Sequence, residues 1–205
     1  MTVIISDKQK FIFIHVIKTA GTSIREAITP NIKEHTIMSG HHSIKEIWKD
    51  KYKDYFKFAF IRNPWDRMVS NYFYFRRTNK SKHWFTKAFN SCDEFLNGFD
   101  KFDKFQAIYP QSYWLENENG DVKTEYLSSE DGNIKMDFIG KFENLQNDFD
   151  YICNKINVPL TKLPHMKETN YKHYSTYYND KSIEKVANFY KKEIELGDYK
   201  FERKI

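Results

Sequence analysis

The stretch Phe11–Ile28 reads FIFIHVIKTAGTSIREAI and predicts a strand, a turn and the start of a helix. Residues 11–16 are mostly β-branched or aromatic, which is typical of a strand buried on both faces. Gly21 permits a backbone conformation that other residues resist, and the threonine and serine after it are good helix caps. The apolar spacing over 24–28 then indicates a helix.

A strand that runs through a glycine turn into a helix makes a candidate anion-binding site. The first N–H groups of the helix have no partner within it, and the positive end of the helix dipole lies beside them. Lys18 adds a full charge there. The nucleoside-triphosphate loop differs, because it places Gly-Lys directly before Ser or Thr, whereas here the lysine precedes the glycine by three residues. An ordinary strand-to-helix turn with a hydroxyl cap also fits this pattern.

The composition indicates one globular domain with a mildly basic surface. The chain has 205 residues, a net charge of +5 and 18% aromatic residues, and we interpret residues 1–205 as a single domain. A mild positive charge suits an anionic ligand, although solubility alone also explains it. The only two cysteines, Cys92 and Cys153, lie far apart, which argues against a disulfide framework or a zinc site.

No stretch of the sequence is typical of a signal peptide or a transmembrane helix. Residues 1–10 are polar, and the apolar run over 11–17 is too short to span a bilayer. We therefore expect a cytoplasmic protein without a membrane span. We interpret residues 1–10 as a polar lead-in to the first strand.

Further along the chain, strands and helices alternate. Residues 56–61 and 138–142 are typical of strands, 31–40 of a loop, and 113–127 of a hairpin around its Asn-Gly pair. Helical spacing predicts helices over 44–48, 64–77, 84–108 (as several short ones), 145–156 and 183–194. The alternation predicts an α/β fold with a mostly parallel central sheet flanked by helices on both faces.

The second strand-to-helix junction, like the first, places a basic residue between the end of a strand and the start of a helix. Arg62 follows a strand directly, and Asn63 and Pro64 suit a helix N-cap and the first helical position. Ser70 lies seven residues after the cap and therefore faces the same side of the helix. A guanidinium and a hydroxyl placed in this way can bind a phosphate. Alternatively, Arg62 pairs with Asp66 while the serine faces solvent or backbone.

Two anion-binding turns at one edge of a parallel sheet would suit a ligand with two separated phosphate groups. At this point the sequence resembles the sulfotransferases that use 3′-phosphoadenosine 5′-phosphosulfate (PAPS). Residues 15–24 (HVIKTAGTSI) resemble the 5′-phosphosulfate loop of that family, most closely in its carbohydrate sulfotransferase branch. Residues 58–72 resemble its 3′-phosphate segment, and 138–149 a further strand and helix. The resemblance covers most of residues 11–155 and implies a P-loop-like strand–turn–helix that binds the phosphosulfate.

The resemblance implies a role for each matching residue. The 5′-phosphosulfate would be bound by Lys18, Thr19, Ala20, Gly21, Thr22 and Ser23. Arg62 and Ser70 would bind the 3′-phosphate, and Lys18 would also stabilise charge on the leaving phosphate. The sequence departs from the family at Ile17, where proline is common, and at Ala20, which replaces a frequent glycine. Neither departure removes a phosphate-binding group.

The implied reaction moves the sulfuryl group to a hydroxyl by in-line attack and releases adenosine 3′,5′-bisphosphate. A hydroxyl acceptor needs a general base, and histidine titrates near neutral pH. His41 and His42 come between the two motifs, as a histidine does in some carbohydrate sulfotransferases, and the alignment favours His41. Either could instead cap a helix or lie at the surface, and His15, inside a strand, fits packing or a place near the cofactor better than catalysis. Weaker candidates for the base are Glu26, Glu46 and Glu143.

The expected acceptor is a hydroxyl compound, and an anionic saccharide is one option. A basic run fits an acidic sugar or simply a solvated surface, and comprises Arg76, Arg77, Lys80, Lys82 and His83. Residues 167–172 loosely resemble the segment that covers the 3′ end of the cofactor in relatives. We expect no bound metal, since cationic side chains supply the charge, and no nucleic-acid partner.

Two other classes of function fit parts of the sequence. A nucleotide-dependent phosphotransferase is disfavoured by the order of the lysine and glycine, and by the lack of a clear magnesium-binding aspartate after a strand. A polyanion-binding module would use the basic residues and bind in a strongly salt-dependent way. Many carbohydrate-acting relatives are anchored in the Golgi, so an excised catalytic domain is the alternative to a cytoplasmic protein.

Overall fold

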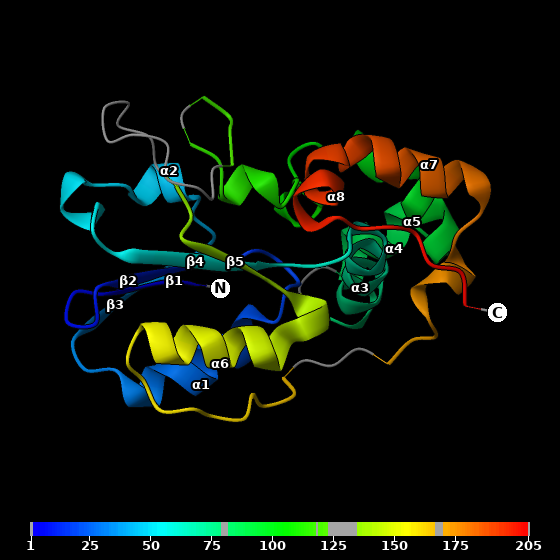
Figure 1. Ribbon diagram of the computed structural model, residues 1–205. Helices are drawn as coiled ribbons and strands as arrows, with labels where there is room; N and C mark the ends of the chain where they lie inside the picture. The colour runs from blue at the N-terminus through cyan, green and yellow to red at the C-terminus, as the bar shows by residue number, and fades with distance from the viewer. Residues whose placement is uncertain (1, 79–81, 118, 123–134, 167–169, 205) are drawn as a thin grey trace. The chain divides into compact units, whose positions relative to one another are not determined.

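The computed structural model describes residues 2–78, 82–117, 119–122, 135–166 and 170–204 (Figure 1). The chain divides into two compact units. The first unit contains Met1–Ile61 and Gln111–Lys167, and the second contains Arg62–Pro110 and Glu168–Ile205. The single domain over residues 1–205 stays a prediction.

The first unit is built on a five-stranded mixed sheet of order β3-β1-β2-β4-β5. Its strands are β1 (Thr2–Ser6), β2 (Phe11–Ile14), β3 (His35–Ser39), β4 (Phe56–Ile61) and β5 (Phe138–Lys141). β4 pairs in parallel with both β2 and β5, whereas β1 pairs antiparallel with both β2 and β3. The α/β class is confirmed, but the prediction of a mostly parallel sheet is wrong, because half of the pairings are antiparallel.

The two antiparallel pairings come from segments whose sequence predicted no strand. Residues 1–10 contain β1 rather than a polar lead-in, and residues 31–40 contain β3 rather than only a loop. β1 has just three apolar residues in a row, and β3 is an edge strand whose side chains are all at least partly exposed. Such strands gain their stability from pairing with neighbours, so their own pattern is weak.

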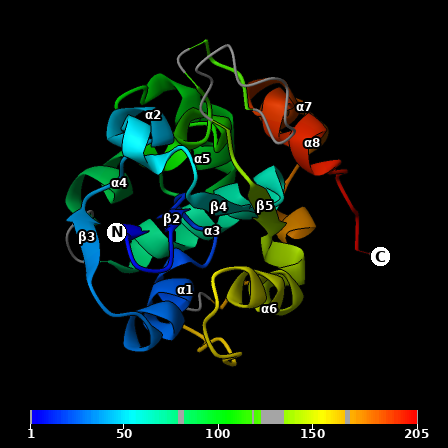
Figure 2. The ribbon, with the colours of Figure 1, turned by 60° about the vertical axis from the view of Figure 1, so that its left-hand side comes forward.

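Helices cover both faces of this sheet, as the sequence predicts (Figures 1 and 2). α1 (Gly21–Ile28) and α6 (Leu145–Lys155) lie on one face, and α2 (Ile44–Ile47) lies on the other (Figure 1). The core under α1 and α6 is formed by alternate residues of the central strands and by the facing helix residues, among them Phe11, Phe13, Phe58, Phe60, Ile24, Ile28, Phe149 and Ile152. Short 3₁₀ helices in this unit are Thr29–Asn31, Asp50–Tyr52, Ser112–Trp114 and Phe142–Asn144.

The second unit is helical and rich in aromatic side chains. Its helices are α3 (Pro64–Arg77), α4 (Lys82–Ala88), α5 (Cys92–Gly98), α7 (Asp180–Phe189) and α8 (Lys191–Gly197), with 3₁₀ helices at Phe99–Lys101, Gln106–Ile108 and Tyr174–Tyr177. The predicted helices over 64–77 and 84–108 are confirmed, and the one over 183–194 is divided between α7 and α8. Arg67 of α3 is fully buried and donates to the backbone carbonyls of Ala107 and Tyr109 at 3.2 and 2.9 Å.

Several predictions fall wholly or partly outside the described residues. Over 113–122 the described residues form a turn, in which the Asn117 N–H donates to the Asp121 carbonyl at 2.8 Å, and they contain no strand of the predicted hairpin. Lys80, the side chains of Lys82 and His83, and residues 123–127 and 167–169 are not described. No described helix is long and apolar enough to cross a membrane. Within the described chain, no group of His, Cys, Asp and Glu side chains could hold a metal ion.

Candidate active site

The turn between β2 and α1 is built by an unusual backbone conformation. Lys18 and Ala20 have φ angles of 67° and 65°, which place both in the left-handed region that non-glycine residues rarely adopt. Ala20 is the N-cap of α1, and its carbonyl accepts the first helical hydrogen bond from the Ile24 N–H at 3.2 Å. The N–H groups of the first helical turn therefore point out of the helix end. The predicted order of strand, turn and helix is confirmed, while phosphate binding by this turn stays a prediction.

Gly21 is required for space rather than for an unusual backbone angle. Its φ angle is not positive, so the predicted conformational reason is wrong. A Cβ atom at this position would lie 2.0 Å from Cδ2 of His15. Only glycine lets the imidazole of His15 lie directly against the first turn of α1.

The hydroxyl side chains of the turn do not cap the helix, in contrast to the prediction from the sequence. Thr19 is buried, and its Oγ1 donates to the carbonyl of Val16 at 3.0 Å, which closes the turn onto itself. Ser23 is also buried, and its Oγ accepts from the Met166 N–H at 3.3 Å. The cap position itself is held by Ala20, whose side chain has no polar atom. Thr22 and Lys18 are half-buried at the same end of the helix.

His41 lies beside this turn. Its Nδ1 is 3.4 Å from the carbonyl oxygen of His15, and the two imidazole rings are 5.7 Å apart in an edge-on arrangement. The other side of His41 faces Trp114, at 5.4 Å between ring centroids. His15 directly follows β2 rather than lying inside it, and it is buried and stacks on Phe13 at 6.0 Å, so the predicted packing is confirmed. A continuous row of rings thus leads from the glycine of the turn to His41.

The surroundings of His41 keep its imidazole neutral and fix its tautomer. Burial lowers the pKa of His41 from 6.5 to about 4, because a charged imidazolium would lose its hydration. The His15 carbonyl can only accept, so Nδ1 carries the proton and Nε2 carries the lone pair. Nε2 is buried and has no hydrogen-bond partner among the described residues. The imidazole of His41 is therefore neutral, and the lone pair of its Nε2 is buried without a hydrogen-bond partner among the described residues.

His42 has different surroundings from its neighbour. Its Nε2 lies 3.0 Å from the Ser39 carbonyl oxygen, and its Nδ1 lies 3.8 Å from Oε2 of Glu46. The same carboxylate oxygen accepts from the Ser43 N–H at 2.8 Å, so Glu46 takes part in capping the N-terminus of α2. The other two carboxylates considered as a base, Glu26 and Glu143, are exposed.

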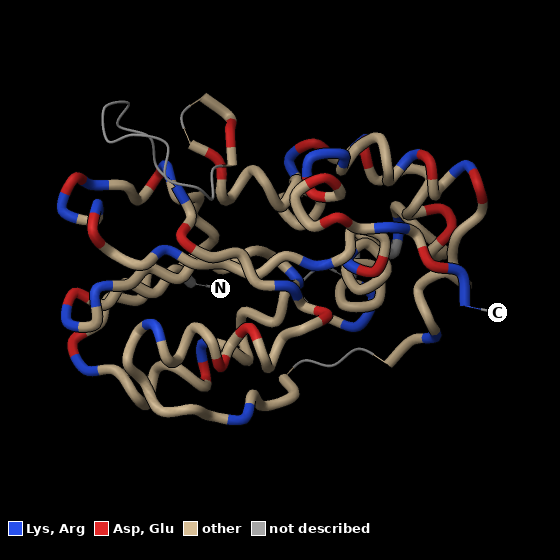
Figure 3. The backbone as a smooth tube through the Cα atoms, in the orientation of Figure 1, with Lys and Arg blue, Asp and Glu red and all other residues tan. Residues whose placement is uncertain are grey.

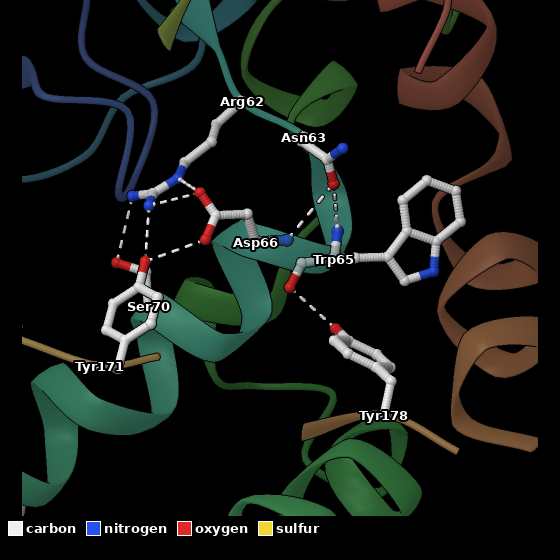
Figure 4. Close-up of polar contacts among 7 residues, drawn as sticks. All are labelled: Arg62, Asn63, Trp65, Asp66, Ser70, Tyr171 and Tyr178. Atoms are coloured by element: carbon white, nitrogen blue, oxygen red, sulfur yellow. Dashed lines mark hydrogen bonds and ion pairs between the residues drawn. The ribbon is translucent and has the colours of Figure 1, made fainter. Parts of the chain in front are cut away.

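The second junction, in the helical unit, is built by side chains (Figure 4). Asn63 is the predicted N-cap of α3, and its Oδ1 accepts from the N–H groups of Trp65 and Asp66 at 3.0 and 3.3 Å. Pro64 occupies the first helical position, as the sequence predicts. The Trp65 carbonyl in turn accepts from the Tyr178 hydroxyl at 2.8 Å.

Arg62 pairs with Asp66, as the alternative interpretation of the sequence predicts, but Ser70 contacts Arg62 instead of facing solvent or backbone (Figure 4). Its Nε and Nη2 donate to Oδ2 of Asp66 at 2.9 and 2.7 Å, and its Nη1 donates to Oγ of Ser70 at 3.2 Å. Its Nη2 also donates to the Tyr171 hydroxyl at 2.7 Å. The sequence did not identify Tyr171 as a neighbour of Arg62 or Trp114 as a neighbour of His41. The loose resemblance over residues 167–172 was the only signal for Tyr171, and the sequence contained no signal for Trp114.

Comparison with known proteins gives the family. The sulfotransferase family matches residues 1–200, and the chain belongs to it. The chain is 34% identical to carbohydrate sulfotransferase 11 of Rattus norvegicus and to that of Mus musculus over 130 residues, which is 57% of this chain and 37% of each relative. The likeness to the carbohydrate branch is thereby confirmed, although the matched part is well under half of those two proteins.

A third relative is matched over most of its own length. An uncharacterised protein of Archaeoglobus fulgidus is 32% identical over 113 residues, which is 55% of this chain and 77% of that protein. No solved structure matches the chain significantly.

Proposed function

We propose that this protein transfers the sulfuryl group of PAPS to a hydroxyl group of a saccharide. The observation that carries the proposal is the match to the sulfotransferase family over residues 1–200, which includes both predicted phosphate-binding segments. The saccharide acceptor rests on the names of the rat and mouse relatives. PAPS as donor rests on the likeness of residues 15–24 and 58–72 to the family's nucleotide-binding segments.

In this proposal, the turn after β2 binds the 5′-phosphosulfate. The first N–H groups of α1 and the charge of Lys18 act on the same anion, and the side chain of Lys18 stabilises the charge that develops on the leaving 5′-phosphate. β2 and β4 are parallel neighbours, with Ile14 opposite Ala59, so the chain leaves both strands at the same edge of the sheet. Arg62 follows β4 directly and binds the 3′-phosphate together with Ser70.

His41 acts as the general base. Its Nε2 accepts the proton of the acceptor hydroxyl, whose oxygen forms a bond to sulfur while the bond between sulfur and the bridging phosphate oxygen breaks. The electron pair of that bond leaves with adenosine 3′,5′-bisphosphate. The His15 carbonyl accepts from Nδ1 and stabilises the imidazolium that forms. His41 is favoured over His42 because it lies against the turn, whereas His42 contacts the start of α2.

The proposal is tested by binding and turnover measurements with the full chain. Calorimetry should show that adenosine 3′,5′-bisphosphate binds, and labelled PAPS should transfer its sulfuryl group to a saccharide from a panel of polysaccharides without sulfate. Tight binding of ATP with magnesium, without binding of the bisphosphate, would instead show a phosphotransferase. Binding of heparin alone, with strong salt dependence, would show a polyanion-binding module. Acidic residues lie among the basic ones along the described chain, which does not favour the latter (Figure 3).

The role of His41 is tested by the pH dependence of turnover. A base with a pKa of about 4 stays unprotonated as the pH falls from about 8 to about 5, so kcat/KM should be constant over that range and fall only near pH 4. The His41→Ala variant should lose about 10²-fold or more in kcat and still bind adenosine 3′,5′-bisphosphate. His42→Ala is the matched control and should retain its rate. Full activity of the His41 variant would contradict the assignment.

A further inference from the structure

The guanidinium of Arg62 is held by hydrogen bonds to Asp66 and Tyr171 (Figure 4). Asp66 accepts from Nε and Nη2, which is one edge of the guanidinium plane. The Tyr171 hydroxyl accepts from Nη2 at 2.7 Å and donates to Oδ1 of Asp66 at 3.0 Å. The three side chains therefore form a closed ring of hydrogen bonds, and Nη1 lies outside it, against Ser70.

Tyr171 is itself held in a defined orientation. Its ring stacks on Phe73 of α3, with centroids 5.4 Å apart and planes inclined by only 7°. Tyr177 packs edge-on against the same Phe73 ring at 5.1 Å, and its hydroxyl accepts from the Lys172 N–H at 3.1 Å. Burial raises the pKa of Tyr171 to about 12, so the phenol keeps the proton that it donates to Asp66.

Charge balance alone does not explain this ring. Arg62 is 7% exposed, and a guanidinium this deeply buried needs a carboxylate partner, which Asp66 provides. The Tyr171 hydroxyl adds no charge. Its two hydrogen bonds fix the angle between the guanidinium plane and the carboxylate, and thereby the direction of Nη1 relative to Oγ of Ser70. Preorganised donors of this kind recognise an anion better than mobile ones.

We propose that Asp66 and Tyr171 are positioning residues which orient Arg62 so that its Nη1 and the Ser70 hydroxyl together recognise the 3′-phosphate of the nucleotide. This inference rests on the proposed function, because it assumes a 3′-phosphorylated adenosine ligand. Its consequence is specificity: the ring of hydrogen bonds sets the preference for adenosine 3′,5′-bisphosphate over adenosine 5′-monophosphate, which differs only by the missing 3′-phosphate.

The test compares the affinities of these two nucleotides by calorimetry on the full chain. The Tyr171→Phe variant keeps the ring that stacks on Phe73 and removes only the hydroxyl. It should bind the bisphosphate roughly fivefold more weakly and the monophosphate unchanged, so the preference falls by the same factor. Tyr174→Phe is the matched control, because it removes a tyrosine hydroxyl of the same unit that accepts from the Glu202 N–H at 2.8 Å, outside the ring of hydrogen bonds, and it should keep the wild-type preference.

Asp66→Asn provides a second, independent variant. It keeps the size of the side chain and should also lower the preference, since a neutral amide holds the guanidinium less firmly. Unchanged preference in the tyrosine variant would overturn the inference for Tyr171, and a raised bisphosphate affinity in Asp66→Asn would show that Asp66 competes with the phosphate instead. A wild-type protein that binds both nucleotides with the same affinity would overturn the inference together with the proposed 3′-phosphate site. If the wild type prefers the bisphosphate and the variants keep that preference, only the positioning roles of Asp66 and Tyr171 are overturned, and the proposed function stands.

Discussion

The two strand-to-helix turns of this protein begin their helices in different ways. In the sheet unit, the turn before α1 is formed by the backbone: Lys18 and Ala20 adopt left-handed angles, and the cap residue has no polar side chain. In the helical unit, the start of α3 is formed by side chains: Asn63 caps the helix, and Arg62 is held by hydrogen bonds. The sequence predicted both turns, but it showed the side-chain cap of the second and not the left-handed backbone angles of the first.

The comparison also separates the roles proposed for the two turns. In the proposed function, the N–H groups of the backbone turn and Lys18 act on the 5′-phosphosulfate, whose charge changes during the reaction. The side-chain turn holds Arg62 by hydrogen bonds, and its proposed ligand, the 3′-phosphate, does not react. Changes in the first turn should therefore act mainly on the rate of transfer, and changes in the second mainly on nucleotide affinity.

The largest expected effect is that of Lys18→Ala. Loss of the ammonium should lower kcat for sulfuryl transfer about 10²–10³-fold, because no other described side chain of the turn supplies a full charge to the leaving phosphate. Transfer from labelled PAPS measures the effect. Lys33→Ala, which removes an exposed lysine of the same unit, serves as the control and should keep the wild-type rate. Arg62→Ala should instead weaken the binding of adenosine 3′,5′-bisphosphate. If Lys18→Ala and Arg62→Ala change kcat by the same factor and nucleotide affinity by the same factor, the two turns do not differ in role.

Gly21→Ala should lower the free energy of unfolding by about 1–3 kcal/mol, since the new Cβ would displace the buried ring of His15. Urea denaturation of the variant and the wild type measures this difference. Gly98→Ala is the control, because its nearest atom, Cε1 of Phe89, lies 3.3 Å from the added Cβ. If the free energy of unfolding falls no more in Gly21→Ala than in Gly98→Ala, the ring of His15 moves away without a free-energy cost.

Asn63→Ala should cost about 1 kcal/mol of stability, because two N–H groups at the start of α3 lose their acceptor. The same denaturation experiment measures it. Asn144→Ala offers a comparison at the N-cap of α6, where the described structure shows no capping hydrogen bond from the side chain. If both variants lose the same stability, side-chain capping does not distinguish α3.

Ala20→Gly should have the smallest effect and the opposite sign. Alanine at a φ angle of 65° is strained, and glycine adopts this angle without strain, so the variant should be about 0.5–1 kcal/mol more stable. Ala27→Gly, inside α1, is the control and should be destabilised by roughly 1 kcal/mol. Destabilisation in both variants would show that the left-handed angle at Ala20 is not a source of strain.

The parts of the fold that the sequence predicted correctly are those with long, self-consistent patterns. β2 and β4 are apolar runs, and α3 begins with a cap residue and a proline, so each is specified within its own segment. β1 has only three apolar residues in a row and β3 is an exposed edge strand, and both exist because they pair with neighbouring strands. The mixed character of the sheet therefore followed from contacts that no local pattern encodes.

The candidate site shows the same division. The positions of Lys18, Arg62 and Ser70 relative to a strand end or helix start follow from chain spacing, and the sequence identified them. The reason for Gly21 depends on the ring of His15, the neutral state of His41 depends on its burial beside Trp114, and the orientation of Arg62 depends on a tyrosine 109 residues away.

By itself, the sequence determined the family of this protein, its α/β class and the two turns that follow β2 and β4. The tertiary structure alone decided how each polar group is surrounded. Local hydrogen bonds and apolar periodicity act over a few residues and can be read along the chain. Burial, close packing and pKa depend on atoms brought together from distant segments, and only the folded arrangement fixes which atoms those are.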